Sequence, residues 1–129
     1  MVINKKTKIY VGIILTTLLI ILFLFSKYQT IEIIYFTNSK CLITKKTDKM
    51  VNEIKKDFGD RVNITQIEIS MYPDDLPDTD EIKQLREKYQ VYGVPEIIIN
   101  GKEFTKEYTK DNLEEEICNN LLIKPEVCE

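Results

Sequence analysis

The sequence predicts one α/β domain, a central mixed sheet flanked by helices, preceded by a single hydrophobic helix. Three observations support this fold class. Residues Ile9 to Phe25 form a run of seventeen residues without a charge. Residues Ile31 to Phe36 are apolar nearly throughout, as in a strand buried on both faces of a sheet. Asn100-Gly101 follows a short apolar run and is the strongest local signal for a two-residue hairpin. A chain of 129 residues has room for one such domain.

The hydrophobic run is long enough to be a transmembrane helix. At about 1.5 Å per residue it spans roughly 25 Å, slightly less than a bilayer core of about 30 Å. Interfacial Tyr10 and Tyr28 can make up the difference. The alternative is a cleaved signal peptide, but the run exceeds the usual apolar region of such peptides and no small-x-small site follows it. We therefore expect an uncleaved signal anchor.

The charges around this helix predict its orientation. Lys5, Lys6 and Lys8 precede it, and only Lys27 closely follows it. The positive-inside rule then predicts a single-pass protein of the cytoplasmic membrane, with its amino terminus inside and its domain on the extracytoplasmic side. The expected parts are a cytoplasmic tail (1–8), a transmembrane helix (9–25), a short linker (26–30) and a folded domain (31–129).

A strand, a helix and a second strand begin the domain. We expect the helix after Cys41 to end at Gly59, because glycine favours the C′ position that follows the last helical residue. The second strand spans residues 62–69, but its apolar residues change parity, so we expect a bulge near Thr65 or a later start. A connection of this length predicts a right-handed parallel unit. The helix is expected to bury one stripe of residues, Met50, Val51, Ile54 and Phe58.

A helix, the hairpin and a last helix complete the domain. Asp78 and Asp111 are the expected N-caps of the two helices. Pro95 stands at the head of a strand, where its missing N–H does not disturb the sheet, and Lys102 to Thr105 is the expected return strand. Pro125 prevents the last helix from continuing. The expected buried residues of these helices are Ile82, Leu85, Tyr89, Leu113, Ile117 and Leu121.

The segment from Gly93 to Gly101 has a glycine, a branched residue and a proline, then an apolar strand and Asn-Gly. It resembles the cis-proline hairpin of thioredoxin-like proteins, and the order of elements (βαβαββα) is similar to that family. The resemblance implies that Val94 and Pro95 contact an extended peptide substrate. It also implies that the proline lies beside the redox cysteine of an earlier turn, and the matching residue is Cys41. The family usually has C-x-x-C there, whereas this chain has C-x-x-T, with Thr44 in place of the second cysteine.

Cys41 is the candidate nucleophile. Free N–H groups at a helix amino terminus stabilise a thiolate, and Lys40, Lys45 and Lys46 add nearby positive charge. The alternative is a buried, inert thiol. Thr44 can donate a hydrogen bond to the thiolate, or it can simply fill the first turn of the helix. A hydroxyl cannot attack a mixed disulfide, so dithiol exchange within this motif is excluded.

Cys118 and Cys128 lie ten residues apart on either side of Pro125. In an oxidising compartment we expect them to form a structural disulfide, which stabilises the fold by roughly 2.5–3 kcal/mol through loop closure. The alternative is a second redox pair that serves Cys41.

The composition excludes several classes of function. From residue 26 onward the chain has 15 basic and 21 acidic side chains, which argues against nucleic acid and anionic lipid as partners. The chain has no histidine, so imidazole metal ligands and a Cys-His or Ser-His pair are excluded. Cys41 is about eighty residues from the other two cysteines, a poor basis for a metal site. We expect no metal and no cofactor.

These features predict a membrane-anchored monothiol oxidoreductase. We expect Cys41 to form mixed disulfides with the thiols and disulfides of exported or membrane proteins, among them a membrane redox partner. The alternative is a redox-inert thioredoxin-fold module that binds peptides or a membrane partner. A peroxidase is disfavoured because the Thr/Ser-x-x-Cys spacing of that family is missing. Ser39 is two residues before Cys41, not three.

Overall fold

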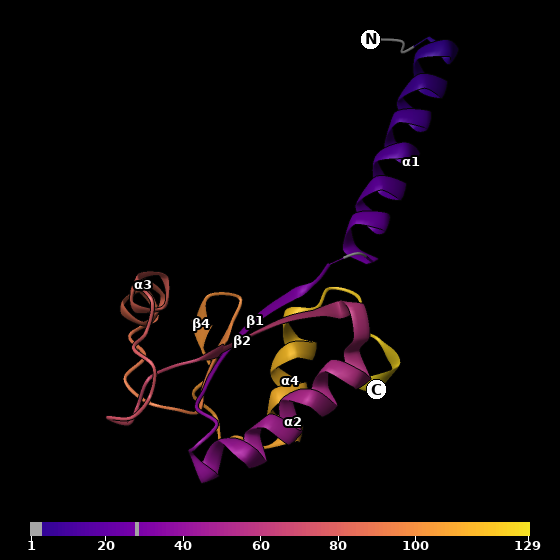
Figure 1. Cartoon of the computed structure of the whole chain (residues 1–129). Coiled ribbons are helices and arrows are strands. Elements are labelled where there is room, and N and C mark those ends of the chain that lie inside the picture. The colour runs from indigo at the N-terminus through magenta and orange to yellow at the C-terminus, as the bar shows by residue number, and fades with distance from the viewer. Residues whose placement is uncertain (1–3, 28) are drawn as a thin grey trace.

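The computed structural model describes residues 4–27 and 29–129 of the chain. The interfacial role expected for Tyr28 lies outside these described residues, as does the start of the expected tail at residues 1–3. Figure 1 shows the elements in order: α1 (Lys5–Lys27), β1 (Ile31–Thr37), α2 (Leu42–Phe58), η1 (Gly59–Arg61), β2 (Val62–Glu68), α3 (Asp80–Tyr89), β3 (Glu96–Ile99), β4 (Lys102–Glu103), α4 (Lys110–Asn120) and η2 (Glu126–Cys128).

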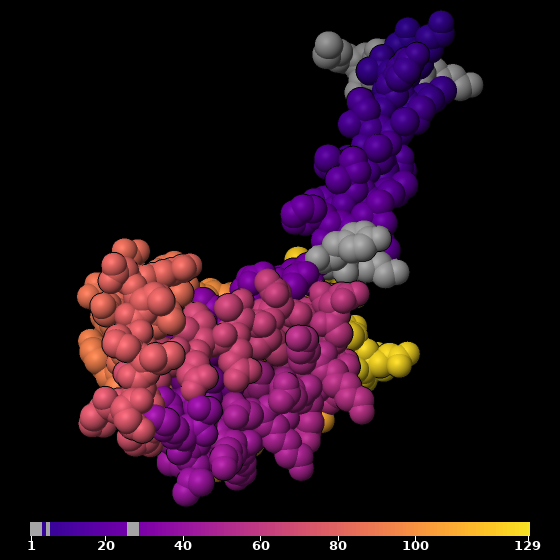
Figure 2. Space-filling view, in the orientation of Figure 1, coloured from indigo at the N-terminus to yellow at the C-terminus, as the bar shows by residue number. Residues whose placement is uncertain are grey.

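α1 is separate from the packed domain, as Figure 2 shows. Its stretch Lys6–Phe25 is long and apolar enough to cross a membrane, and none of it is buried within the protein. A signal sequence near the amino terminus has the same properties. The hydroxyl of Thr17 donates to the carbonyl of Ile13 at 2.8 Å, and that of Thr16 is bonded within the helix in the same way. The helix therefore satisfies these polar groups internally, as an apolar solvent requires.

The sheet has four strands in the order β2-β1-β3-β4. β1 is parallel to β2 and antiparallel to β3, and β4 is antiparallel to β3. α2 and α4 cover one face of the sheet, and α3 covers the other (Figure 1). The expected central mixed sheet with flanking helices is confirmed, in the expected order of elements.

Alternation along β1 divides its apolar residues between two cores. Ile33 and Tyr35 pack with α2 and α4, while Phe36 packs with the residues of α3. Along β2 the pairing with β1 runs from Val62 to Glu68 without interruption, so the expected bulge or late start was wrong. The parity change has another cause: because both faces of the sheet are covered, the strand contributes to one core at its start and to the other at its end.

The N-caps differ from those expected. Thr79 and Thr109 cap α3 and α4, and their side chains accept hydrogen bonds from the amides three residues on. Asp78 does not cap because its carboxylate accepts instead from the Ser70 amide and pairs with Arg86. Asp111 lies within the first turn of α4, where a negative charge is favourable. The expected end of α2 is confirmed, with Gly59 at a φ of +51°.

The hairpin between β3 and β4 forms as expected. Asn100 and Gly101 both have positive φ, +48° and +80°, as a type I′ turn requires. The Asn100 side chain also accepts from the Glu32 amide at 3.0 Å, which joins the turn to β1. The return strand is shorter than Lys102 to Thr105, because regular pairing ends at Glu103.

Candidate functional site

The candidate site lies at the carboxyl end of β1. There the chain turns through residues 38–41 into α2. β3 runs antiparallel to β1, with Glu96 opposite Phe36, so the amino end of β3 lies at the same edge of the sheet. The Val94–Pro95 peptide bond, just before β3, is cis. The topology therefore brings Cys41 and Val94-Pro95 to one edge, as the sequence resemblance implies.

Cys41 is the N-cap residue of α2 and has a free, partly exposed thiol. Its backbone is extended, with φ −80° and ψ 121°, and its side chain forms no capping hydrogen bond. Its amide donates to the carbonyl of Asn38 at 3.0 Å, which closes the turn. The thiol thus stands where the unpaired N–H groups of a 17-residue helix begin.

Thr44 is fully buried. Its hydroxyl lies 2.8 Å from the carbonyl oxygen of Asn38 and 2.7 Å from that of Cys41, so its one hydrogen is shared between two backbone acceptors. Of the two roles considered from the sequence, this geometry is that of a residue filling and closing the first turn of α2.

Asn38 organises this turn, and sequence reasoning missed it. The side chain is buried, its amide nitrogen donates to the Ile69 carbonyl and to Asp75 at 2.8 Å each, and its Oδ1 accepts from the Lys40 amide at 3.0 Å. Asn38 therefore fixes the Cys41 turn to the loop after β2. The only sequence signal was the turn composition of residues 37–40, which does not distinguish a buried asparagine from an exposed one.

The loop of residues 70–79 is held to the turn by charge. The Lys40 ammonium lies 2.8 Å from Asp74 and 2.7 Å from Asp75. Hydrogen bonds from Lys40, and then from the amides of Met71 and Tyr72, hold the pKa of Asp75 well below its usual range. The same carboxylates raise the pKa of Lys40. The expectation that Lys40 supplies positive charge to Cys41 is therefore corrected, because two carboxylates offset that charge.

A pocket of about 480 Å³ lies between this loop and the turn. Eight of its twelve lining residues are polar or charged, and the acidic side chains already have partners: Glu68 accepts from the Ser39 hydroxyl at 2.6 Å, and Asp78 pairs with Arg86. The pocket therefore contributes shape beside the turn rather than a set of free charges. Its lining includes Asn38, Lys40, Glu68, Asp75, Leu76 and Asp78.

A buried polar group fixes α2 to the sheet. The Tyr35 hydroxyl donates to Oδ1 of Asp48 at 2.8 Å, and the Thr37 hydroxyl donates to the same oxygen at 3.3 Å. Burial is the main reason that the pKa of Tyr35 lies above its usual value. These bonds set the position of the first turns of α2, and hence of Cys41, relative to β1.

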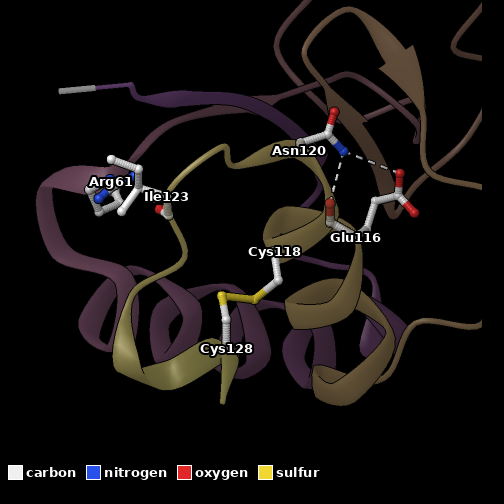
Figure 3. The surroundings of a disulfide bond; sticks show 6 residues. All are labelled: Arg61, Glu116, Cys118, Asn120, Ile123 and Cys128. Carbon is white, nitrogen blue, oxygen red and sulfur yellow. Dashed lines mark hydrogen bonds between the residues drawn. A yellow bond between two sulfur atoms is a disulfide. The ribbon is translucent and has the colours of Figure 1, made fainter. Parts of the chain in front are cut away.

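Cys118 and Cys128 form a disulfide, with their Cα atoms 5.7 Å apart, which joins α4 to η2 (Figure 3). Cys118 is buried in the core between the sheet and α2. The disulfide is near the carboxyl end of α4, where Asn120 contacts Gln29, a residue just before the start of β1. Cys41 instead follows the carboxyl end of β1. The structure therefore does not bring these cysteines to Cys41.

Among residues 4–27 and 29–129, no group of three or more histidine, cysteine or acidic side chains could hold a metal ion. The donor chemistry at the site is instead one thiol, backbone amides and paired carboxylates.

No family model and no curated protein matches the sequence. Solved structures do match. The exposed lipoprotein thioredoxin Etrx1 of Streptococcus pneumoniae is 18% identical, with a TM-score of 0.53 over 71% of this chain and 87% of its own. The germline-specific thioredoxin Deadhead of Drosophila melanogaster is 13% identical, with a TM-score of 0.51 over 74% and 83%. Oxidised thioredoxin of Plasmodium falciparum is 15% identical, with a TM-score of 0.50 over 75% and 86%.

At identities this low the likeness shows the fold alone. The chain has a thioredoxin-like fold. Within that fold it has one free cysteine among the described residues, at the amino end of α2.

Proposed function

We propose that this chain is a membrane-anchored thioredoxin-like protein that exchanges disulfides through Cys41 as a monothiol. The observation that supports this most is the position of Cys41: a free, partly exposed thiol at the N-cap of α2, at the same sheet edge as Val94-Pro95. Free amides at a helix amino terminus favour the thiolate, which is the attacking species in disulfide exchange.

The reaction that this arrangement supports has two steps. The Cys41 thiolate attacks one sulfur of a substrate protein disulfide, which forms a mixed disulfide and releases the other substrate sulfur as a thiolate. An external thiolate must then attack the substrate sulfur of the mixed disulfide, which releases Cys41 as a thiolate and leaves the external sulfur bonded to the substrate sulfur in a new disulfide. Thr44 is a buried hydroxyl and the other two cysteines are bonded to each other, so no resolving thiol is provided by the chain at this site.

Exposed apolar side chains are suited to an extended peptide substrate. Leu42, next to Cys41, is 77% exposed, and Tyr92, three residues before Pro95, is 83% exposed. Large exposed apolar side chains on both sides of a site favour a partner surface there. We assign Val94, Pro95 and these two residues to contact with thiol- or disulfide-containing exported or membrane proteins, among them a membrane redox partner.

We further propose that α1 is an uncleaved anchor. Its stretch Lys6–Phe25 has 20 residues, about 30 Å of helix, which matches a bilayer core when Lys6 and Lys8 are at the cytoplasmic surface. With lysines before it, the cytoplasmic side holds the tail (1–8), and the linker (26–30) and domain (31–129) face the extracytoplasmic side. The helix extends beyond the span expected at 9–25, from Lys5 to Lys27.

A redox-inert binding module is the second candidate. Two observations favour it: the Thr44 hydroxyl is bonded to backbone carbonyls, and the Lys40 charge is offset by Asp74 and Asp75. Both leave Cys41 with less chemical assistance than the sequence suggested. The exposed apolar side chains fit either candidate.

Alkylation separates the two candidates. The full chain in detergent, with its disulfide intact, should react with iodoacetamide once, at Cys41, and faster at neutral pH than a free-thiol peptide of the same local sequence. Mass spectrometry follows the adduct, and Cys41→Ser is the blank. A rate equal to that of the peptide, or slower, would favour the inert module.

A further inference from the structure

The segment after α4 is fastened to the point where the chain leaves α1. The side-chain amide of Gln29 uses both of its ends: Nε2 donates to the Asn120 carbonyl at 3.0 Å, and Oε1 accepts from the Leu122 amide at 3.0 Å. Gln29 is two residues beyond Lys27, where α1 ends. In Figure 1 the yellow segment after α4 accordingly lies close to the lower end of α1.

Two further links hold the segment in place. Arg61 donates from Nε to the Gln29 carbonyl at 3.1 Å and from Nη2 to the Ile123 carbonyl at 2.9 Å. The disulfide fixes the end of the segment to α4, as Figure 3 shows. The backbone of Leu122 therefore cannot leave Gln29 without breaking several bonds.

Leu122 is 79% exposed despite this fixed backbone. Single exposed leucines are common on protein surfaces, but this one is held beside a proposed membrane anchor. Gln29 is four residues beyond Phe25, at most roughly 10 Å farther from the bilayer core, and the headgroup layer extends about 5–7 Å from that core. At the far limit Leu122 lies roughly 3–5 Å outside the headgroup layer, and its side chain spans that distance by turning toward the membrane.

We propose that Leu122 inserts into the headgroup region of the bilayer that holds α1, so that residues 122–124 are a second membrane contact of the domain. The inference rests on the proposed anchoring of α1. Removal of the Leu122 side chain from water provides the favourable free energy of insertion. The exposed Lys124 nearby can pair with a lipid phosphate. A zwitterionic bilayer suffices, because the excess of acidic side chains in the domain argues against attraction to anionic lipid.

This contact determines where the site faces. Cys41 follows the opposite end of β1, and seven strand residues correspond to about 23 Å. With the Gln29 end of the domain seated on the membrane, the thiol lies at the other end of the strand. Its substrates would then be thiols on folded or unfolded segments outside the bilayer, rather than cysteines within it.

The absence of tryptophan from the chain permits a direct test. Single tryptophans are introduced into the full chain as Leu122→Trp, Leu15→Trp within α1, and Leu76→Trp, which replaces a 90% exposed leucine beside the site. The proteins are reconstituted into phosphatidylcholine vesicles whose acyl chains are brominated near the headgroup in one preparation and near the terminal methyl in another, so that both the surface and the centre of the bilayer are probed. We expect bromine quenching and a blue-shifted emission for Leu15→Trp and Leu122→Trp, and neither for Leu76→Trp.

The variants also distinguish the two proposals. Quenching of Leu15→Trp while Leu122→Trp behaves like Leu76→Trp would overturn the second contact and leave the anchor standing. Absence of quenching in Leu15→Trp would overturn the anchor and the contact with it. Gln29→Ala should reduce the quenching of Leu122→Trp by releasing residues 120–122, and Gln84→Ala, at an exposed glutamine on α3, should not. Equal quenching in both backgrounds would contradict the role of Gln29.

Discussion

Asn38 connects three parts of the site through one buried side chain. It bonds Ile69, Asp75 and the amide of Lys40, while its own carbonyl receives the Cys41 amide. An asparagine is suited to this position because it has two donors and an acceptor and no charge to desolvate.

We predict that Asn38→Ala lowers the free energy of unfolding by about 1–3 kcal/mol, because it leaves buried backbone groups without partners. Thermal denaturation of the full chain in detergent, followed by circular dichroism, measures the change. Asn52→Ala, at an exposed position of α2, is the matched control and should cause no loss. Equal melting temperatures for the two variants would show that the turn does not depend on Asn38.

The sequence predicted which site residues to examine but not all of their roles. Cys41 could be placed before a helix because residues 37–40 have turn composition and the apolar stripe from Met50 to Phe58 follows. The orientation of the Thr44 hydroxyl toward two carbonyls could not be predicted, since a threonine in a first helical turn has several acceptors within reach. The pairing of Lys40 with Asp74 and Asp75 depends on a contact between residues over thirty positions apart, which no local pattern reveals.

The loop of residues 70–79 depends on one carboxylate for its attachment. Asp75 accepts from Lys40, Asn38 and two amides of its own loop, so its ionised form is favoured in the folded state. The folded pKa is lowered below the unfolded value of about 3.9. A group shifted in this direction stabilises the fold above pH of about 4, and its contribution is lost as the pH falls below that value.

We therefore predict that Asp75→Asn lowers the melting temperature at pH 7. The difference in melting temperature between this variant and the wild type should become smaller as the pH falls from 5 to 3. Melting curves across this range measure it. Asp60→Asn, at an exposed position of η1, should give no such narrowing gap. A gap that is constant from pH 7 to pH 3 would mean that the Asp75 charge is not what holds the loop.

The misplaced caps and the absent bulge have one physical cause. Local rules chose Asp78 as a cap and treated β2 as a strand with one buried face. In the folded chain Asp78 is used by Ser70 and Arg86, and both faces of the sheet are covered, so the apolar residues of β2 change sides without a bulge. Tertiary contacts overrode local preference in both cases. The hairpin was predicted well because its two positive φ values depend on Asn100 and Gly101 alone.

The Cys118–Cys128 disulfide and the Gln29 and Arg61 bonds stabilise the end of the domain nearest to α1. We predict that Cys118→Ala lowers the free energy of unfolding by about 2–3 kcal/mol, since the disulfide closes a loop of ten residues. Calorimetry with and without reductant measures this loss. Cys41→Ala should leave the melting temperature nearly unchanged in either condition, and a wild type insensitive to reductant would contradict the structural role.

In the whole chain, α1 and the segment after α4 are near one end of β1, and Cys41 follows the other end. The fold class, the order of elements and the apolar first helix were all readable from hydrophobic periodicity. The hydrogen bonds from the Gln29 side chain to the backbone of Asn120 and Leu122 could not be predicted from the sequence, because they are polar contacts between residues about ninety positions apart.

The lifetime of a Cys41 mixed disulfide tests the central claim most directly. The full chain is oxidised with glutathione disulfide, and the adduct is followed by mass spectrometry after the oxidant is removed. We predict that the wild-type adduct persists until an external thiol is added. Thr44→Cys should shorten its lifetime, because residues three apart in a helix have Cβ atoms about 5–6 Å apart, near enough for a disulfide after a small adjustment.

The Cys118→Ser, Cys128→Ser double variant is the control, and its Cys41 adduct should live as long as that of the wild type. A longer-lived Cys41 adduct in this double variant would show that Cys118 and Cys128 act as a resolving pair. If Cys41 forms no adduct in wild type or in any of these variants, the exchange proposal is wrong and the protein is a redox-inert binding module.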